Sequence, residues 1–542
     1  MPTSVSPTPP PPPPEMVVKN RFLSFLIWQS IPSTAIFLLS KTFLSSLSSS
    51  RPSLLTVFLT FFSFHLSLLL FSAALSLLSS PLPLRGAHPL RLAAILLRLL
   101  LFSGPPGSPD FRRRDRLSLG FFLFVAVSTA SGLVAAVSVC LVASLGDYDD
   151  GFVGRVGFRG FVMGLLYGLH YVYNRRWVLE FPIIQRPPFF SFKMGLPPAT
   201  TRALKLSGAA YLLSAVLIVL LSDQFASHAT FGKFIAEQIV FFLGSFAVFL
   251  SWELSHHLHR VLHTKRFVFA PPKGSAAAET NPSEPLLAAL EESNPSSLLQ
   301  YLAYLDLCMV CENNVDAWRR AAFFEESGET YERVRAVGLR PLEQLASRLG
   351  EALESSSDKS LQLSNQLRSP TDVKPDPDCS ALLNNFQLYT WCARIVASLT
   401  ACSYEEDRFG VAQLSGSNAA VISTLVSCLL AIESFMGKNI NVQSPNSLMG
   451  PAGIKWATSS MRRTDVGMRK KRGGHVHSKA YPIADVLKTS IYEIVSAFHG
   501  EMVASAKVGL LEKDWIITGK PPFGSRELLL QKLQLFLDFR AT

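Results

Sequence analysis

Long runs of apolar residues dominate the first half of the chain. A helix that crosses a bilayer needs about 17–25 mostly apolar residues, because unpaired backbone polar groups are costly in hydrocarbon. Six stretches meet this requirement, at residues 22–39, 54–78, 117–143, 156–173, 204–221 and 234–252. Arg159 and Glu237 lie near the ends of two of them, where they can reach the membrane interface. We therefore predict a six-helix transmembrane domain over residues 21–253.

The second half of the chain repeats apolar residues at spacings of three and four, which is typical of helices that bury one face. This pattern predicts helices at residues 298–311, 342–353, 382–401, 419–435, 483–498 and 528–539. Two stretches, near 355–378 and 438–479, have the polar or Pro/Gly-rich composition of mobile loops. Residues 298–542 should thus form one soluble α-helical domain, which makes the whole chain an all-α membrane protein.

The remaining segments are polar or of low complexity. Residues 1–20 form a Pro-rich N-terminal tail without the basic start of a cleavable signal peptide. Residues 254–297 should join the two domains, as an interfacial His-rich segment followed by a Pro-, Ala- and Ser-rich linker. Residues 89–102 are too short to span, so we expect either a helix in the headgroup layer or a short re-entrant or packing helix.

The distribution of basic residues predicts how the membrane domain is oriented in the bilayer. The chain has 51 Lys and Arg against 40 Asp and Glu, a net charge of +11, and much of the excess lies in every second loop of the membrane domain. Such loops stay on the cytosolic side, so both termini should lie there. Candidate surfaces facing membrane or partners are the basic runs Arg112, Arg113, Arg114 and Arg469, Lys470, Lys471, Arg472. A solvated loop is the alternative for the second run, and no direct contact with nucleic acid is expected.

Three glycines indicate close helix packing in the fourth predicted span. Gly160, Gly164 and Gly168 are spaced by four residues and therefore share one helical face. Glycines on one face let a neighbouring membrane helix approach closely. We expect this face to contribute to the architecture of the bundle and not to chemistry.

Residues that carry catalysis or hold metals are few. His256, His259 and His263 share a helical face, but histidine-box membrane enzymes need further boxes on other helices, and the sequence has none. We expect these histidines to face lipid headgroups. Cys308 and Cys311 form a lone CxxC pair, for which core packing is the favoured interpretation. We therefore predict no catalytic residue, no metal site and no cofactor.

Two motifs in the second half resemble a known family. The run 398–413 contains Tyr404, Glu405, Asp407, Arg408, Phe409 and Gly410. The run 302–307, LAYLDL, is followed by Arg319, Arg320 and Phe323. Their order and spacing, together with six spans and a helical C-terminal domain, resemble the Ndc-type transmembrane nucleoporins.

This resemblance implies a pore-membrane protein that anchors the nuclear pore scaffold in the nuclear envelope and thereby supports pore assembly and nucleocytoplasmic transport. The implied partners are the nuclear envelope membrane, inner-ring and linker nucleoporins and an Aladin-type propeller protein. A second copy of the chain is an open alternative. The implied protein is not an enzyme.

Other classes remain open from the residues alone. One is a polytopic transporter or lipid-handling protein with a helical regulatory domain, although paired carboxylates are missing from the predicted spans. Another is a metalloenzyme built on residues 256–263. The motif around Phe409 has two interpretations: a partner site, or a helix-ending turn in which Gly410 takes a positive φ and Phe409 is buried. We favour the turn.

Overall fold

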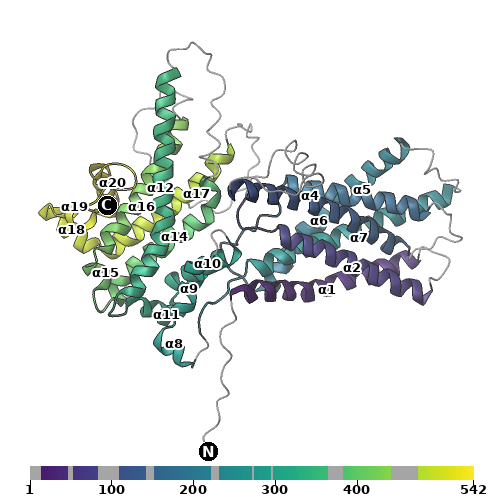
Figure 1. Cartoon of the computed structure of the whole chain (residues 1–542), viewed down its shortest axis with the longest axis horizontal. Helices are drawn as coiled ribbons and strands as arrows, with labels where there is room; N and C mark the ends of the chain where they lie inside the picture. The colour runs from purple at the N-terminus through teal and green to yellow at the C-terminus, as the bar shows by residue number, and fades with distance from the viewer. Residues whose placement is uncertain are drawn as a thin grey trace, which may run out of the picture. The chain divides into compact units, whose positions relative to one another are not determined.

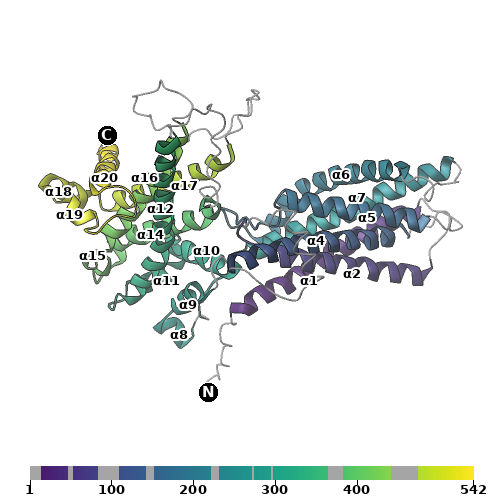
Figure 2. The same ribbon diagram turned by 45° about the horizontal axis from the view of Figure 1, so that its top comes forward.

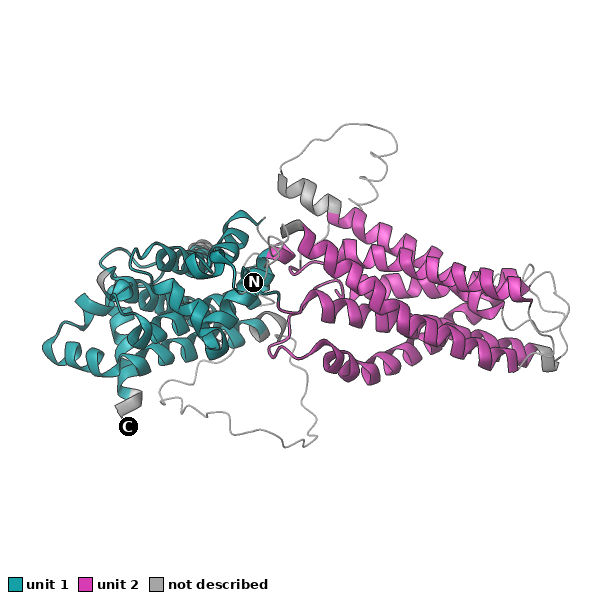
Figure 3. Cartoon of the chain, turned by 90° about the horizontal axis from the view of Figure 1, so that it is seen from below, with its two compact units in different colours: residues 1–11, 267–295, 300–542 teal, residues 12–266, 296–299 magenta. Residues whose placement is uncertain are grey.

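The computed structural model describes residues 14–46, 53–83, 109–141, 152–220, 231–271, 274–293, 297–363, 382–440 and 474–541. These residues form helices and no β-strand, apart from one isolated bridge between Ser80 and Val178. The chain divides into two compact units, shown in magenta and teal in Figure 3. We call residues 12–266 with 296–299 the bundle unit, and residues 1–11, 267–295 and 300–542 the helical unit. The predicted all-α fold class is confirmed.

Six long helices run side by side in the bundle unit (Figures 1 and 2). All six are long and apolar enough to cross a membrane. They are α1 (Pro14–Ser46), α2 (Leu54–Leu78), α4 (Pro109–Cys140), α5 (Phe152–Tyr173), α6 (Pro188–Leu220) and α7 (Phe231–His263). α4 packs against α2 and α5, and α7 packs against α1 and α6. Aromatic rings fill the centre, where Phe71 of α2 stacks on Trp252 of α7 with ring centroids 4.7 Å apart.

The structure corrects the expectation for the histidine run. α7 continues without interruption through these residues, and His256, His259 and His263 are buried instead of facing headgroups. The reason is that neighbouring helices cover this face of α7. Phe25 of α1 packs edge-on against His259 with ring centroids 5.2 Å apart, and Tyr171 of α5 packs edge-on against His256 at 5.3 Å. Arg21 of α1 also donates hydrogen bonds to carbonyl groups at the end of α7, including that of His263 at 2.9 Å.

α4 and α5 approach closely at the glycines of α5. A Cβ atom on Gly164 would lie 2.3 Å from the carbonyl oxygen of Ser128, and one on Gly160 would lie 2.7 Å from that of Gly132. A Cβ atom on Gly168 would lie 3.0 Å from the backbone of α4. Backbones this close leave no room for side chains. Gly132 supplies the matching small residue on α4, which the sequence analysis did not single out.

We expect Gly164→Ala to destabilise the bundle unit by about 1–3 kcal/mol, because an added methyl group forces α4 and α5 apart. Thermal unfolding of the full chain in detergent, followed by size-exclusion chromatography, measures the change. Gly208→Ala in α6 is the matched control, since nothing lies within 4 Å of a Cβ atom there. Equal melting temperatures for the two variants would contradict the packing argument.

Charged residues inside the bundle unit are paired. The expectation that Arg159 and Glu237 reach the membrane interface is wrong, because both are buried. Arg155 of α5 donates to Glu237 of α7 at 2.9 Å, and Arg159 donates to Gln238 at 2.8 Å. These contacts offset the cost of burial, because Arg155 and Glu237 form an ion pair and the Arg159 guanidinium has a hydrogen-bond acceptor on the neighbouring helix.

The helical unit contains the remaining helices, apart from the first two residues of α10. They are α8 (Ala276–Thr280), α9 (Glu284–Glu292), α10 (Leu298–Glu312), η1 (Asn314–Asp316), α11 (Ala317–Ala321), η2 (Ala322–Phe324), α12 (Glu329–Leu363), η3 (Leu383–Asn385), α14 (Phe386–Glu406), α15 (Val411–Leu414), α16 (Ser417–Ile440), α17 (Gly474–Ala497), α18 (His499–Val508), α19 (Leu511–Trp515) and α20 (Arg526–Ala541). α16 is a seventh helix apolar enough to cross a membrane, but it packs against α12, α14 and α17 as the core of this unit.

The segment expected to be a linker is partly folded. α9 buries Leu286, Leu287 and Leu290 and packs against α12. Arg333 of α12 donates to Glu284 at 2.9 Å and to Glu291 at 2.9 Å. The sequence analysis missed this short amphipathic helix. A nine-residue helix has only a few apolar positions, which are too few to show helical periodicity within a segment of low complexity.

The helices also extend into both stretches expected to be loops. α12 continues to Leu363, and α17 already begins at Gly474. α16 ends at Ile440, inside the second stretch. The rest of those loops lies outside the described residues, as do the segment 89–102 and the run Arg469, Lys470, Lys471, Arg472. Arg112, Arg113 and Arg114 lie on α4, just before its apolar part Leu117–Cys140.

Candidate interaction site

A fully buried ion pair holds together the first of the two sequence motifs. Asp306 of α10 is 0% exposed and Arg319 of α11 is 2% exposed. The Arg319 guanidinium donates to Asp306 Oδ2 at 2.9 Å and to the carbonyl oxygen of Phe269 at 3.0 Å. The backbone N–H of Phe269 donates to the same carboxylate at 2.9 Å. This cluster fixes the segment around Phe269 and α11 against α10.

Arg320, the next residue, connects the two motifs. Its Nε donates to Glu406 Oε2 at 2.9 Å, and its Nη1 donates to the carbonyl oxygen of Cys311 at 2.8 Å. Glu406 is the last residue of α14. The hydrogen bonds that Arg320 donates to Glu406 raise the pKa of Arg320, which keeps the guanidinium charged. Residues about a hundred positions apart in the sequence thus form one cluster of α10, α11 and α14.

The turn between α14 and α15 is held by its own side chains. Asp407 accepts hydrogen bonds from the backbone N–H groups of Val411 at 3.0 Å and Ala412 at 2.8 Å, and so caps α15. Gly410 has φ +69°, a conformation that glycine adopts without steric cost. The predicted turn with a positive-φ glycine is confirmed.

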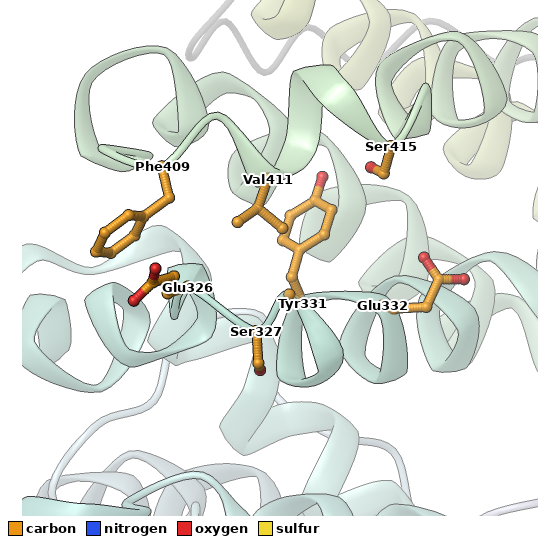
Figure 4. A pocket seen from close by; sticks show the side chains of 8 residues that line it. Glu326, Ser327, Tyr331, Glu332, Phe409, Val411 and Ser415 are labelled. Carbon is orange, nitrogen blue, oxygen red and sulfur yellow. The ribbon is translucent and has the colours of Figure 1, made fainter.

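Phe409 departs from the expectation, because its side chain is 54% exposed and not buried. Asp407 turns back onto α15, and Ala412 is the residue of this segment that enters the core. Figure 4 shows the Phe409 ring extending toward Glu326 at the start of α12. Tyr404, Glu405 and Arg408 are exposed as well. The tertiary structure therefore presents an aromatic side chain on a fixed turn.

A cavity of about 450 Å³ lies beside Phe409, between this turn and the start of α12 (Figure 4). Its lining contains two carboxylates and no basic side chain. The lining residues are Glu326, Ser327, Gly328, Tyr331, Glu332, Phe409, Val411 and Ser415. Gly328 has φ +69°, and a Cβ atom there would lie 3.0 Å from Val411, so glycine also keeps this wall open.

Hydrogen bonds and aromatic packing make the α12 wall of the cavity rigid. The Glu325 carboxylate accepts from the backbone N–H of Thr330 at 3.2 Å and from the hydroxyl of Ser327 at 2.9 Å. Hydrogen bonding from Thr330 lowers the pKa of Glu325. Tyr331 packs on Phe324 with centroids 5.6 Å apart, and burial raises its pKa to about 12. Both walls are therefore pre-formed.

The sequence analysis had named residues on one side of this site only. It identified the turn of residues 404–410 but missed Glu326, which lies just before α12, and Tyr331 and Glu332 on α12. The run EESGE at 325–329 carries a recognisable helix-start signal, since serine and glycine precede an acidic first turn. Nothing in this run indicates which other segment of the chain lies opposite it.

We expect Phe409→Ala to change the free energy of unfolding by less than about 0.5 kcal/mol, because the ring is largely in solvent. Phe323→Ala is the matched comparison: Phe323 is 1% exposed, and its loss should cost about 3–5 kcal/mol. Urea unfolding of the full chain in nanodiscs measures both. A large loss for Phe409→Ala would mean that the ring is part of the core.

The candidate metal and redox residues have packing roles. Cys308 and Cys311 are buried in α10, which confirms the predicted core role, and burial raises the pKa of both thiols. The rings of His259 and His263 stack on each other at 3.8 Å. Across the described ranges, no group of three or more His, Cys, Asp or Glu residues has an arrangement that could hold a metal ion.

Comparison with known families gives one match. A family model described as "Nucleoporin protein Ndc1-Nup" matches residues 156–380 and 344–502. The two ranges together cover more than half of the chain, including most of α5, all of α6 and α7, and the whole candidate site. A search among curated proteins finds no match.

Proposed function

Since the chain belongs to the Ndc1-Nup family of nucleoporins, we propose that it anchors the scaffold of the nuclear pore complex in the nuclear envelope. The observation that supports this role most directly is the division of the chain. The bundle unit has six helices of membrane-spanning length, and the separate helical unit presents Phe409 beside an open cavity. One unit suits the bilayer and the other suits a protein partner.

The proposed topology has six spans and both termini on the cytosolic or nucleoplasmic side. Its support is the excess of basic residues in alternate loops, including Arg112, Arg113 and Arg114 before the apolar part of α4. α16 is left out of the spans because its apolar residues are already buried by other helices of the helical unit.

The proposed partners follow from family membership. They are inner-ring and linker nucleoporins and an Aladin-type protein, with self-association as an alternative. The protein would act in pore assembly, and so in nucleocytoplasmic transport, without catalysis and without direct contact with nucleic acid. The basic run 469–472 and residues 112–114 are candidate membrane- or partner-facing surfaces, and Tyr404, Glu405 and Arg408 are candidate contacts next to Phe409.

A transporter or lipid-handling protein is the second candidate, and one observation bears on it. Glu237 and Glu253 are buried inside the bundle unit, where transporters place functional carboxylates. Both are, however, paired with arginines, Glu237 with Arg155 at 2.9 Å and Glu253 with Arg176 at 2.7 Å. Carboxylates held in such ion pairs are not free to bind a transported ion or proton, which favours the structural anchor over the transporter.

The experiment that tests the proposal is the native location of the full chain with a C-terminal tag, combined with proximity labelling from the same tag. A punctate nuclear rim with scaffold nucleoporins enriched is the expected result. An unrelated endoplasmic reticulum membrane protein with the same tag serves as the control. A signal spread through the reticulum without nucleoporins would instead favour the transporter.

A further inference from the structure

We propose that the cavity beside Phe409 binds an arginine side chain presented by a segment of a partner nucleoporin. This inference rests on the proposed anchoring function and adds the chemistry of the partner. The walls of the cavity come from two separate segments of the helical unit, the start of α12 and the turn before α15. Its volume of about 450 Å³ lies in the range of ligand-binding clefts, about 300–1,000 Å³.

The acidic lining of the cavity favours a positively charged ligand. Glu326 and Glu332 line it, and no lysine, arginine or histidine does. Glu332 forms an ion pair with Arg335, whose side chain is not part of the lining. Glu326 is exposed and has no cationic partner within the described part of the chain. The carboxylate of Glu326 therefore gives the cavity an uncompensated negative charge, which attracts positive groups and discriminates against negative ones.

The exposed ring of Phe409 favours arginine over lysine. This ring lies beside Glu326, whereas Tyr331 is buried behind Val411 and supports the wall of the cavity (Figure 4). A guanidinium group is planar, stacks on aromatic faces and donates two parallel hydrogen bonds to a carboxylate. An ammonium group is compact and strongly hydrated, so it gains less from the same surroundings. Val411 and Phe409 additionally offer apolar contacts for the arginine stem.

The site is ready to bind without rearrangement. Asp407 and Gly410 hold one wall, and Glu325 with its hydrogen bonds to Ser327 and Thr330 holds the other. Groups that are fixed before binding lose little conformational entropy when the ligand arrives. A half-exposed phenylalanine on such a turn is a suitable anchor, since aromatic residues in well-formed pockets dominate protein interfaces.

Site-specific photo-crosslinking in the full chain tests this inference. p-Benzoylphenylalanine in place of Ser415, an exposed lining residue, is activated in cells, and the crosslinked segment is identified by mass spectrometry. We expect the segment to belong to a nucleoporin and to contain an arginine. Glu326→Lys should reduce the crosslink by about tenfold or more, as the loss of a central contact does.

Two controls sharpen the experiment. Glu512→Lys changes an exposed carboxylate of the same unit that lies on α19 and does not line the cavity, and it should leave the crosslink intact. The recovered segment is then synthesised and titrated against the full chain in nanodiscs by fluorescence anisotropy. Replacing its arginine by lysine should weaken binding several-fold, and replacing it by alanine should weaken binding by about tenfold or more.

Several outcomes overturn the inference. They are a crosslink to lipid or to the chain itself, a segment without arginine, a crosslink unaffected by Glu326→Lys, or the absence of any crosslink. Its failure is distinguishable from that of the anchoring function. If the tagged protein lies at the pore with nucleoporin neighbours and the crosslink is absent or independent of arginine, only the assignment of the cavity fails.

Discussion

Asp306→Ala is expected to lower the free energy of unfolding of the helical unit by about 3–5 kcal/mol. Asp306 is fully buried and pairs with the equally buried Arg319. Removing the carboxylate leaves a guanidinium group without a counter-charge in the interior. It also removes the acceptor of the Phe269 N–H group, so two buried donors lose their partner at once.

Hydrogen exchange of the full chain in nanodiscs measures this effect, because peptides from α10 and α11 report on the helical unit alone. Asp485→Ala is the matched control: it removes an exposed aspartate from α17 and should change stability by less than about 0.5 kcal/mol. Equal protection in the two variants would show that the buried pair contributes nothing beyond a surface residue. Replacing Asp306 by leucine together with Arg319 by methionine should recover part of the loss.

Glu253→Ala should have a comparable effect on the bundle unit, again about 3–5 kcal/mol. Glu253 is 1% exposed, accepts from Arg176 at 2.7 Å and lies 3.5 Å from Arg202. Its removal leaves the Arg176 guanidinium, which also lies over the rings of Tyr167 and Tyr171, without its counter-charge. The contact between α7 and the segment after α5 should therefore loosen.

The yield of monodisperse protein after heating, measured by fluorescence-detected chromatography, reports this loss. Glu180→Ala serves as the control, since Glu180 is an exposed carboxylate of the same unit. Glu253→Gln should fall between the two variants, because the amide keeps an oxygen that accepts from Arg176. If Glu253→Ala is as stable as Glu180→Ala, the pair is not part of what holds the bundle together.

The two motifs that carry the family resemblance acquire a physical meaning in the structure. Asp306, Arg319, Arg320 and Glu406 are buried or partly buried, and they fix elements against one another. Tyr404, Glu405, Arg408 and Phe409 are exposed, and the turn that the buried residues hold presents the Phe409 ring to solvent. The two interpretations of the motif around Phe409, a structural turn or a partner site, therefore do not exclude each other. The buried motif residues form the support, and the exposed ones, Phe409 among them, are open to contact.

The sequence by itself determined the class of the protein. A bilayer imposes a minimum apolar length on every span, so the six membrane-length helices and the helical second half could be predicted from hydrophobic periodicity alone. The glycine-capped turn at residue 410 was also predictable, because positive φ is a local property of glycine.

Only the tertiary structure decided which polar residues meet. Arg155 forms an ion pair with Glu237, and Arg320 forms one with Glu406, although the partners lie far apart in the sequence. The start of α12 likewise faces the distant residue Phe409 across a cavity. Periodicity shows which face of a helix is buried but not which neighbour covers it. His259 and His263 of α7 are covered by α1, and Phe409 is exposed, for the same reason: burial depends on long-range packing, which no local sequence pattern records.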